Sequence, residues 1–181
     1  MDIRGDETGL DPPAAPDDDA VPEAVRRVAD VLVGAGVEAR LHEFLESTPT
    51  ATAAARAIGC GPDQIVKSLI FVCDGDPALV MVSGSSRADD AKIAKAVGAK
   101  SVKIAKPAVV FDRTGFEVGG VAPFPLPNIR TAICDRRLLG HDVVWAGAGS
   151  VRHMVALAPH DLVKLSSARA ADVSARSIGS D

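Results

Sequence analysis

Aromatic side chains are scarce in this 181-residue sequence, which has no tyrosine, one tryptophan and an aromatic content of 3%. Proteins that hold single-stranded nucleic acid by base stacking usually need several exposed aromatic rings. Any nucleic-acid contact by this chain must therefore rest mainly on charge, shape and backbone groups. Hydrophobic residues still make up 47% of the chain, so its core has to be built from valine, isoleucine, leucine and alanine.

Paired cysteines, metal-ligand clusters and long apolar runs are also missing. The three cysteines form no Cys-x-x-Cys motif, which is typical of reduced thiols in a cytosolic protein. The four histidines lack ligand spacing, so the sequence predicts no metal. No segment approaches the roughly 20 apolar residues of a membrane span, and the acidic N-terminus does not resemble a signal peptide. We expect a soluble, cytoplasmic protein with no membrane partner.

The chain has too few basic residues to bind a long nucleic-acid duplex. The formal net charge is −4, but residues 1–20 alone hold seven acids and one base, so the remainder carries about +2. Such a mildly basic body can meet an RNA end but has no footprint for DNA. We expect residues 1–21 to be a disordered acidic tail, residues 22–166 to form one domain, and residues 167–181 to be a flexible C-terminal tail.

Hydrophobic periodicity and turn residues divide the expected domain into helices and strands. The helices are expected over residues 22–33, 50–59, 88–97, 107–113 and 159–165. The strands are expected over residues 38–44, 65–73, 78–83, 102–104, 129–134, 143–146 and 154–158. Hairpins and helices are mixed rather than strictly alternating. The sequence therefore predicts a single mixed α/β domain with a curved mixed sheet or barrel-like core and flanking helices.

Lys67 is the sharpest local anomaly, because it interrupts the apolar run Ile65–Cys73. A charged side chain is costly inside a strand unless it is paired or reaches a polar site. Lys67 is either a strand-end lysine whose amine reaches solvent, or a cation that faces a cleft and binds a phosphate or a developing oxyanion. The spacing alone favours the first interpretation and leaves the second open.

Two glycine-rich loops are candidate ligand sites. In the first, Gly119 and Gly120 let the backbone approach a ligand and expose amide N–H groups, and Pro123 begins a stiff proline-rich stretch. The second, residues 146–150, follows a strand, but it lacks a P-loop lysine and does not continue as Gly-x-Gly-x-x-Gly, so a nucleotide-binding fold is not expected. Each pattern alone is also typical of an ordinary turn.

Conventional catalytic groups are hard to find. Ser150 has no Gly-x-Ser-x-Gly context, and no cysteine lies in a cationic setting. His153 follows the second loop and is either a substrate contact or a structural histidine. Asp161 lies at an expected helix start, where an acid also favours the helix dipole. A hydrolase built on this sequence has to work without a protein nucleophile.

Four motifs nevertheless occur in a fixed order. They are IVKSLIF at residues 65–71, TGFEVGGVAPF at 114–124, WAGAGS at 145–150 and LAPHDLV at 157–163. In this order the sequence resembles the YbaK / prolyl-tRNA synthetase-associated editing domain family, over roughly residues 22–166. The resemblance implies a single α/β domain that hydrolyses the ester joining a wrong amino acid to the terminal adenosine of tRNA.

The resemblance also implies roles for particular residues. Lys67 and Gly120 become the expected catalytic residues: the lysine holds the terminal phosphate or ribose, and the loop backbone binds the aminoacyl carbonyl. The expected substrate-binding residues are Gly119, Pro123, Gly147, Gly149, Ser150, His153 and Asp161. Water or the free ribose hydroxyl attacks the ester, and Lys67 and backbone N–H groups stabilise the oxyanion. No metal or organic cofactor is needed.

The expected partner is the acceptor end of an aminoacyl-tRNA, with an aminoacyl-tRNA synthetase as a further candidate. The 181 residues hold no synthetase segment, so we expect a free-standing trans-editing deacylase. Two stretches that border the expected pocket, Phe124–Pro127 and Ser150–His153, depart from the Gly-His and Thr-Pro-His of many relatives, and they leave the removed amino acid unassigned. The alternatives are a non-catalytic module that binds a tRNA end, a nucleotide end or a protein, and a hydrolase of another activated ester.

Overall fold

The computed structural model describes residues 21–46, 48 and 50–175. The strands in this part of the chain are β1 (Arg40–Glu43), β2 (Val66–Cys73), β3 (Asp76–Ser83), β4 (Val102–Ile104), β5 (Thr131–Asp135), β6 (Val144–Gly147), β7 (His153–Leu157) and β8 (Arg169–Ala171). The helices are α1 (Glu23–Ala35), α2 (Ala51–Ile58), α3 (Asp90–Val97), α4 (Pro107–Thr114) and α5 (Pro159–Ser166), with short 3-10 helices η1 (Pro62–Gln64) and η2 (Arg136–Gly140).

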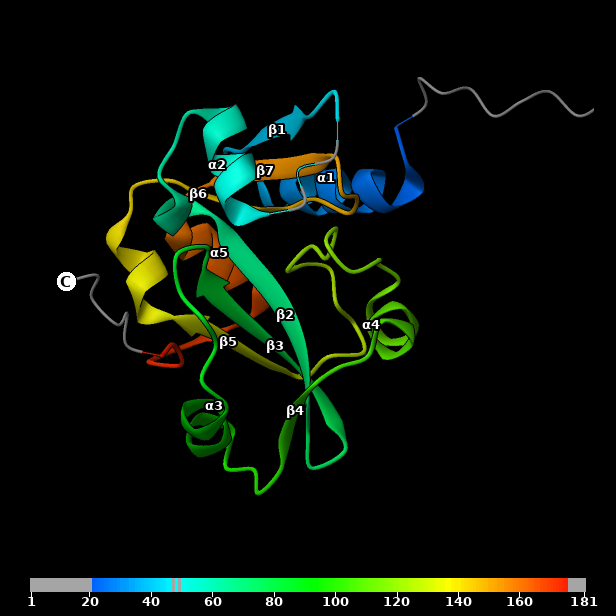
Figure 1. Ribbon diagram of the computed structural model, residues 1–181. Coiled ribbons are helices and arrows are strands. Elements are labelled where there is room, and N and C mark those ends of the chain that lie inside the picture. Colours follow the sequence, from blue (N-terminus) through cyan, green and yellow to red (C-terminus); the bar gives the residue numbers. More distant parts are fainter. Residues whose placement is uncertain (1–20, 47, 49, 176–181) are drawn as a thin grey trace, which may run out of the picture.

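These strands form two sheets (Figure 1). The larger sheet has the strand order β4-β2-β3-β5-β8, and the smaller has the order β1-β7-β6. A hairpin joins β2 to β3 through Asp74 and Gly75, whose φ angles of 50° and 96° are those of a two-residue turn with left-handed backbone. β3 pairs with β5 in parallel, and β5 pairs with β8 in parallel, so the larger sheet is mixed.

Side chains of β2 alternate between two cores, as the pleat of a strand requires. Val66 and Ile70 face a core shared with α1, α4, α5 and the smaller sheet. Phe71 and Cys73 face the opposite side, where α3 packs through Ile93. Helix α2 covers the other face of the smaller sheet in a third apolar cluster. Strand β2 is therefore buried on both faces, which explains its nearly continuous apolar sequence.

The predicted mixed α/β domain with flanking helices is confirmed. Within the described residues the strands form two sheets and not a closed barrel. The predicted strand at 129–134 is β5, displaced by two residues at its start, and the other expected elements are present. No helix in the described part of the chain has the length and apolar character needed to cross a lipid bilayer.

The prediction of a flexible tail from residue 167 is wrong for residues 167–175. Strand β8 pairs with β5, and Val173 and Ser174 have no exposed surface. The Ser/Ala-rich sequence carries no hydrophobic period here, so only its long-range pairing with β5 orders it. The predicted acidic tail, residues 1–21, and the last residues, 176–181, lie outside the described residues, apart from Val21.

Candidate active site

A cleft of about 630 Å³ lies beside the first half of β2, next to Ile65, which forms an isolated bridge with Trp145 of the smaller sheet. Its lining includes residues 65–70, the start of α2 and Ile104 at the end of β4. The rest of the lining includes Val118, Gly119 and Val121 of the first glycine-rich loop, and Gly147, Ser150, Val151, His153 and Met154 in and after the second. Most of the lining side chains are apolar. A concave, mainly apolar site of this size with a few polar groups is typical of a small-molecule site.

Among the described residues that line this cleft, Lys67 is the one lysine or arginine. It donates a hydrogen bond to the carbonyl oxygen of Ser86, and its side chain is half-buried. Burial lowers the pKa of Lys67, and the positive charge of Arg87 lowers it further. None of the ion pairs among the described residues involves Lys67. No carboxylate of the described residues therefore neutralises this charge, and the amine can bind an anionic group of a ligand.

The edge of β2 beside Ser68 is open toward the cleft. Strand β4 pairs with β2 only over Phe71–Cys73, and the Ala105 N–H then donates to the Ile70 carbonyl over 2.9 Å. Alternate residues of a strand point their backbone groups to the same edge, so those of Ser68 point to this side as well. The Ser68 hydroxyl is buried and has no hydrogen-bond partner among the described residues. Such a group costs about 1–3 kcal/mol unless a ligand or water pairs with it.

The two glycine-rich loops pack directly against each other. The Gly149 N–H donates to the Gly120 carbonyl over 3.0 Å. A Cβ at Gly120 would lie 2.8 Å from the Cα of Ser150, and a Cβ at Gly147 would lie 2.7 Å from the carbonyl oxygen of Val121. Only glycine permits so close a backbone approach. The close packing of the two loops therefore depends on glycine, and one glycine of each loop, Gly119 and Gly147, lines the cleft.

The backbone of Gly120 differs from its expected catalytic role. Its N–H donates to the Glu117 carbonyl over 3.0 Å, so this amide is already paired. The amides of Gly119 and Val121, by contrast, donate to no acceptor within the described residues, and both residues line the cleft. The first loop can thus offer hydrogen bonds to a substrate oxygen from the residues on either side of Gly120.

His153 is buried, with 5% of its surface exposed, and lies at the cleft. Its Nδ1 lies 2.7 Å from the Ser150 hydroxyl, which also accepts a hydrogen bond from the Arg152 N–H over 3.1 Å. A hydroxyl oxygen can accept two hydrogen bonds, so Ser150 either donates to Nδ1 or accepts from it, depending on the tautomer of the ring. The Nε2 of the same ring lies 3.8 Å from Oε2 of Glu43. Burial lowers the pKa of His153, and Arg152 lowers it as well, against an opposing effect of Glu43.

This arrangement does not make Ser150 an activated nucleophile. In a Ser-His-acid triad the serine bonds Nε2 and the acid bonds Nδ1. Here the order is reversed, and the Ser150 hydroxyl is held inside its own turn by the Arg152 N–H. Ser150 and His153 instead contribute two polar side chains, hydrogen-bonded to each other, to the lining of the cleft.

The structure brings five of the predicted site residues to the cleft: Lys67, Gly119, Gly147, Ser150 and His153. Three others, Pro123, Gly120 and Gly149, are buried and are not among the residues that line it.

Asp161 is not brought to the cleft. It occupies the first turn of α5, where its carboxylate lies 3.4 Å from Nε2 of His160. The helix buries Leu162 in the main core. The location of Asp161 fits the helix-dipole interpretation of this acid.

Sequence reasoning missed three groups around the site: the unpaired hydroxyl of Ser68, the carboxylate of Glu43 and the carbonyl of Ser86. Ser68 had a local signal, because it is a second polar residue within the apolar run of β2, which is buried on both faces. Glu43 and Ser86 had none, because only the folded chain brings them to His153 and Lys67. Within the described residues no group of three or more His, Cys, Asp and Glu side chains could hold a metal ion.

A model of the aminoacyl-tRNA editing domain family matches residues 46–165. The chain belongs to this family. The match spans all the predicted site residues, from Lys67 to Asp161, and both glycine-rich loops. The resemblance predicted from the four motifs is thereby confirmed.

Individual proteins of known sequence or structure agree with this assignment. The chain is 33% identical over 125 residues to the uncharacterized protein YwhH of Bacillus subtilis (strain 168), which covers 68% of this chain and 79% of YwhH. It is 34% identical over 88 residues to a proline–tRNA ligase of Nitratidesulfovibrio vulgaris (strain DP4), where the match covers 49% of this chain but 15% of the ligase. A crystal structure described as a candidate trans-editing enzyme for prolyl tRNA synthetase superimposes with a TM-score of 0.80 and 36% identity, covering 86% of this chain and 99% of the other.

Proposed function

We propose that the protein is a free-standing trans-editing deacylase, which hydrolyses the ester between a wrong amino acid and the terminal adenosine of tRNA. Its partner is the acceptor end of a mischarged tRNA, with an aminoacyl-tRNA synthetase as a second candidate partner, and its place of action is the cytoplasm, where tRNA is charged. Membership of the editing-domain family and the similarity to a candidate trans-editing enzyme support this proposal.

The observation that carries the proposal is the unpaired cation in an apolar cleft. The Lys67 ammonium has no acidic partner among the described residues, and three further groups of residues that line the same cleft, the hydroxyl of Ser68 and the amides of Gly119 and Val121, have no hydrogen-bond partner there either. An ester of tRNA offers the complementary groups: a terminal phosphate, an aminoacyl carbonyl and a ribose hydroxyl. A cleft of about 630 Å³ has room for a nucleoside and its amino acid.

In the proposed mechanism, a water molecule attacks the aminoacyl carbonyl, and the neighbouring free ribose hydroxyl can hold that water by a hydrogen bond. The C–O bond to the ribose breaks as the tetrahedral intermediate collapses, and the proton of the nucleophile goes to the leaving ribose oxygen. Lys67 and the amides of Gly119 and Val121 stabilise the negative charge on the carbonyl oxygen, and their fixed positions reduce the cost of reorganisation. A ribose requirement gives such a site a means of selecting RNA.

A deacylation assay on a panel of mischarged tRNAs tests the proposal. We expect the wild-type protein to hydrolyse one or a few of them, and Lys67→Ala to lose roughly 100-fold or more of this activity. Lys103→Ala is the matched control, because Lys103 is an exposed lysine on the neighbouring strand β4 and its variant should retain full activity.

Other outcomes would change the assignment. Tight binding of uncharged tRNA without turnover of any substrate would identify a non-catalytic binding module. Equal turnover of simple aminoacyl esters without RNA would identify a hydrolase of another activated ester. Retained activity in Lys67→Ala would remove Lys67 from the mechanism.

A further inference from the structure

The carbonyl that holds Lys67 belongs to a loop with its own supporting structure. Ser86 lies in the turn after β3, where the Gly84 N–H donates to the Ile65 carbonyl over 2.7 Å and the Ser86 N–H donates to the Ser83 carbonyl over 3.0 Å. These bonds set the turn beside the start of β2. The position of the Lys67 amine therefore depends on how firmly the Ser86 peptide is held.

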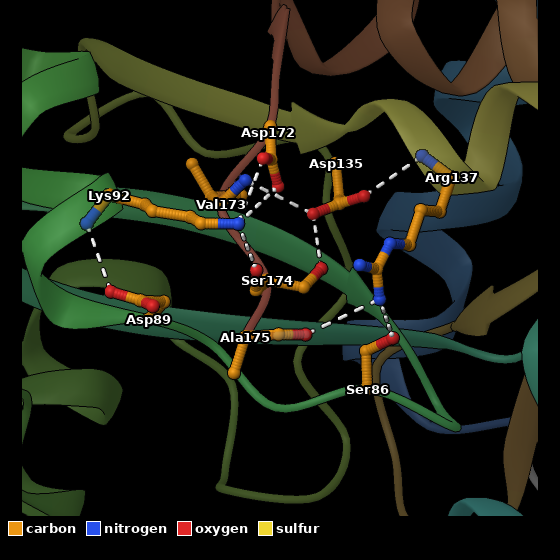
Figure 2. Close-up of polar contacts among 9 residues, drawn as sticks. All are labelled: Ser86, Asp89, Lys92, Asp135, Arg137, Asp172, Val173, Ser174 and Ala175. Atoms are coloured by element: carbon orange, nitrogen blue, oxygen red, sulfur yellow. Dashed lines mark hydrogen bonds and ion pairs between the residues drawn. The ribbon is translucent and has the colours of Figure 1, made fainter. Parts of the chain in front are cut away.

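The C-terminal segment 172–175 holds this turn from the other side (Figure 2). The Asp89 N–H donates to the Val173 carbonyl over 2.9 Å, and the Ala175 N–H donates to the Arg87 carbonyl over 2.9 Å. Between them, Ala88 and Ser174 form an antiparallel bridge. The segment thus pairs with the turn as a short strand would.

Arg137 connects the turn and the segment through its side chain. One guanidinium nitrogen donates to the Ser86 hydroxyl over 3.2 Å and to the Ala175 carbonyl over 3.4 Å (Figure 2). One acceptor belongs to Ser86, whose carbonyl binds Lys67, and the other belongs to Ala175 of the C-terminal segment. A planar guanidinium can hold both acceptors at once in a fixed geometry.

Asp135 fastens the segment to the end of β5. It has no exposed surface, and its carboxylate accepts hydrogen bonds from the Val173 N–H over 3.2 Å, from the Ser174 hydroxyl, and from the Arg137 N–H over 2.9 Å. A buried carboxylate is costly unless such donors surround it. Its placement ties three separate parts of the chain together: β5, η2 and the C-terminal segment.

From this network we propose that Asp135 and the segment 172–175 are positioning elements for the active site, which hold the Ser86 carbonyl against the Lys67 amine and so fix where that amine lies in the cleft. The proposal rests on the proposed function in treating Lys67 as the catalytic cation. It assigns a role to residues 172–175, which lie beyond the part of the chain that the family model matches.

Two variants test the proposal in the full-length protein. Asp135→Asn keeps the size of the side chain but replaces one acceptor oxygen with a donor, and Ser174→Ala is the milder change, which removes one donor. For both we expect kcat for deacylation to fall roughly 10- to 100-fold with an unchanged KM, because a small displacement of a catalytic group acts on the chemical step. Ser85→Ala is the matched control, since its hydroxyl bonds Ser83 and neither Arg137 nor Lys67.

A second measurement is independent of catalysis. The rate at which an acylating reagent labels Lys67, relative to Lys103 in the same sample, reports how well the amine is held. We expect this ratio to rise several-fold in Asp135→Asn and Ser174→Ala and to stay unchanged in Ser85→Ala. A lowered melting temperature with unchanged kcat and unchanged labelling in Ser174→Ala would overturn the proposal. If the wild-type protein deacylates nothing, the proposed function fails, but the labelling ratio still decides whether the network positions Lys67.

Discussion

The Ser150 hydroxyl lies 2.7 Å from Nδ1 of His153, within a single turn that the Arg152 N–H closes. The hydroxyl oxygen accepts from the Arg152 N–H and can either donate to Nδ1 or accept from it, so the bond forms with either tautomer of the ring. Burial disfavours the charged form of the ring and lowers the pKa of His153, although the carboxylate of Glu43 opposes this effect. The folded protein therefore takes up a proton at His153 less readily than the unfolded chain does.

Acidification should destabilise the protein through His153. The unfolded chain takes up a proton near the ordinary histidine pKa of about 6.5, whereas the folded chain resists protonation until a lower pH. The free energy of unfolding therefore falls as the pH drops through about 6.5, and this contribution levels off below the folded pKa. Denaturant titrations between about pH 8 and pH 5 should show a weaker pH dependence in His153→Gln than in the wild type.

The exposed residue His160 provides the control for this experiment. His160→Gln controls for the loss of a histidine as such and should change the free energy of unfolding at pH 8 by less than about 0.5 kcal/mol. A His153→Gln variant with an unchanged pH dependence would show that the ring is protonated equally well in the folded and unfolded chains.

Gly120→Ala should destabilise the protein through a steric conflict. The added Cβ would meet the Ser150 backbone at 2.8 Å, and forcing an extra methyl group into a packed position costs about 1–3 kcal/mol. At Gly140 nothing lies within 4 Å of an added Cβ, so Gly140→Ala should change the free energy of unfolding by less than about 0.5 kcal/mol. If chemical denaturation gave equal changes in the free energy of unfolding for the two variants, the two glycine-rich loops would be able to move apart and accept the added methyl group without loss of stability.

Ser68→Ala should separate stability from activity. Its hydroxyl is buried without a partner among the described residues, so removing it should leave the free energy of unfolding unchanged or raise it by up to about 1 kcal/mol. Deacylation by the variant should nevertheless weaken, with a raised KM for the mischarged tRNA, if a substrate group pairs with this hydroxyl.

Ser83→Ala is the comparison for Ser68→Ala. The Ser83 hydroxyl donates to the Asp63 carbonyl over 3.1 Å and is also buried, so its loss should cost about 1 kcal/mol. A Ser68→Ala variant destabilised to the same degree would show that the Ser68 hydroxyl is already paired in the free protein.

Arg87→Ala should raise the pKa of Lys67. Burial is the main cause of the lowered pKa, and the positive charge of Arg87 is the second, so removing the arginine leaves only the first. An NMR titration of the lysine side chains, with the Lys67 signal assigned from a Lys67→Arg sample, measures the change. Arg136→Ala removes an exposed arginine of the same charge and should leave the titration of Lys67 where it is in the wild type.

Much of the fold was predictable from signals that act over a few residues. Gly98 and Gly115 end α3 and α4 with φ angles of 73° and 69°, and a glycine that directly follows an expected helix is a local signal for its end. Thr50 caps α2 by accepting a hydrogen bond from the Ala53 N–H. The lysine within the apolar run of β2 was also visible, because a charge breaks that pattern wherever the strand is placed.

The C-terminal segment shows where such local signals end. Residues 169–175 have neither the apolar period of a helix nor a clear alternation, and the sequence predicted a flexible tail. Their order comes from β5, which pairs with β8, and from Asp135, which binds Val173 and Ser174. A buried acid and its donors separated by 38 and 39 positions leave no mark in any short window of sequence.

The sequence by itself determined the strand that carries Lys67, the two glycine-rich loops and membership of the editing-domain family, since each depends on residue types at short, fixed spacings. Only the tertiary structure decided which groups these residues meet: the Ser86 carbonyl for Lys67, the Glu117 carbonyl that occupies the Gly120 amide, and a place outside the cleft for Asp161. The reason is physical. A propensity or a turn is settled by neighbours along the chain, whereas a hydrogen-bond partner is settled by how sheets and loops pack, and packing brings together residues that are distant in sequence.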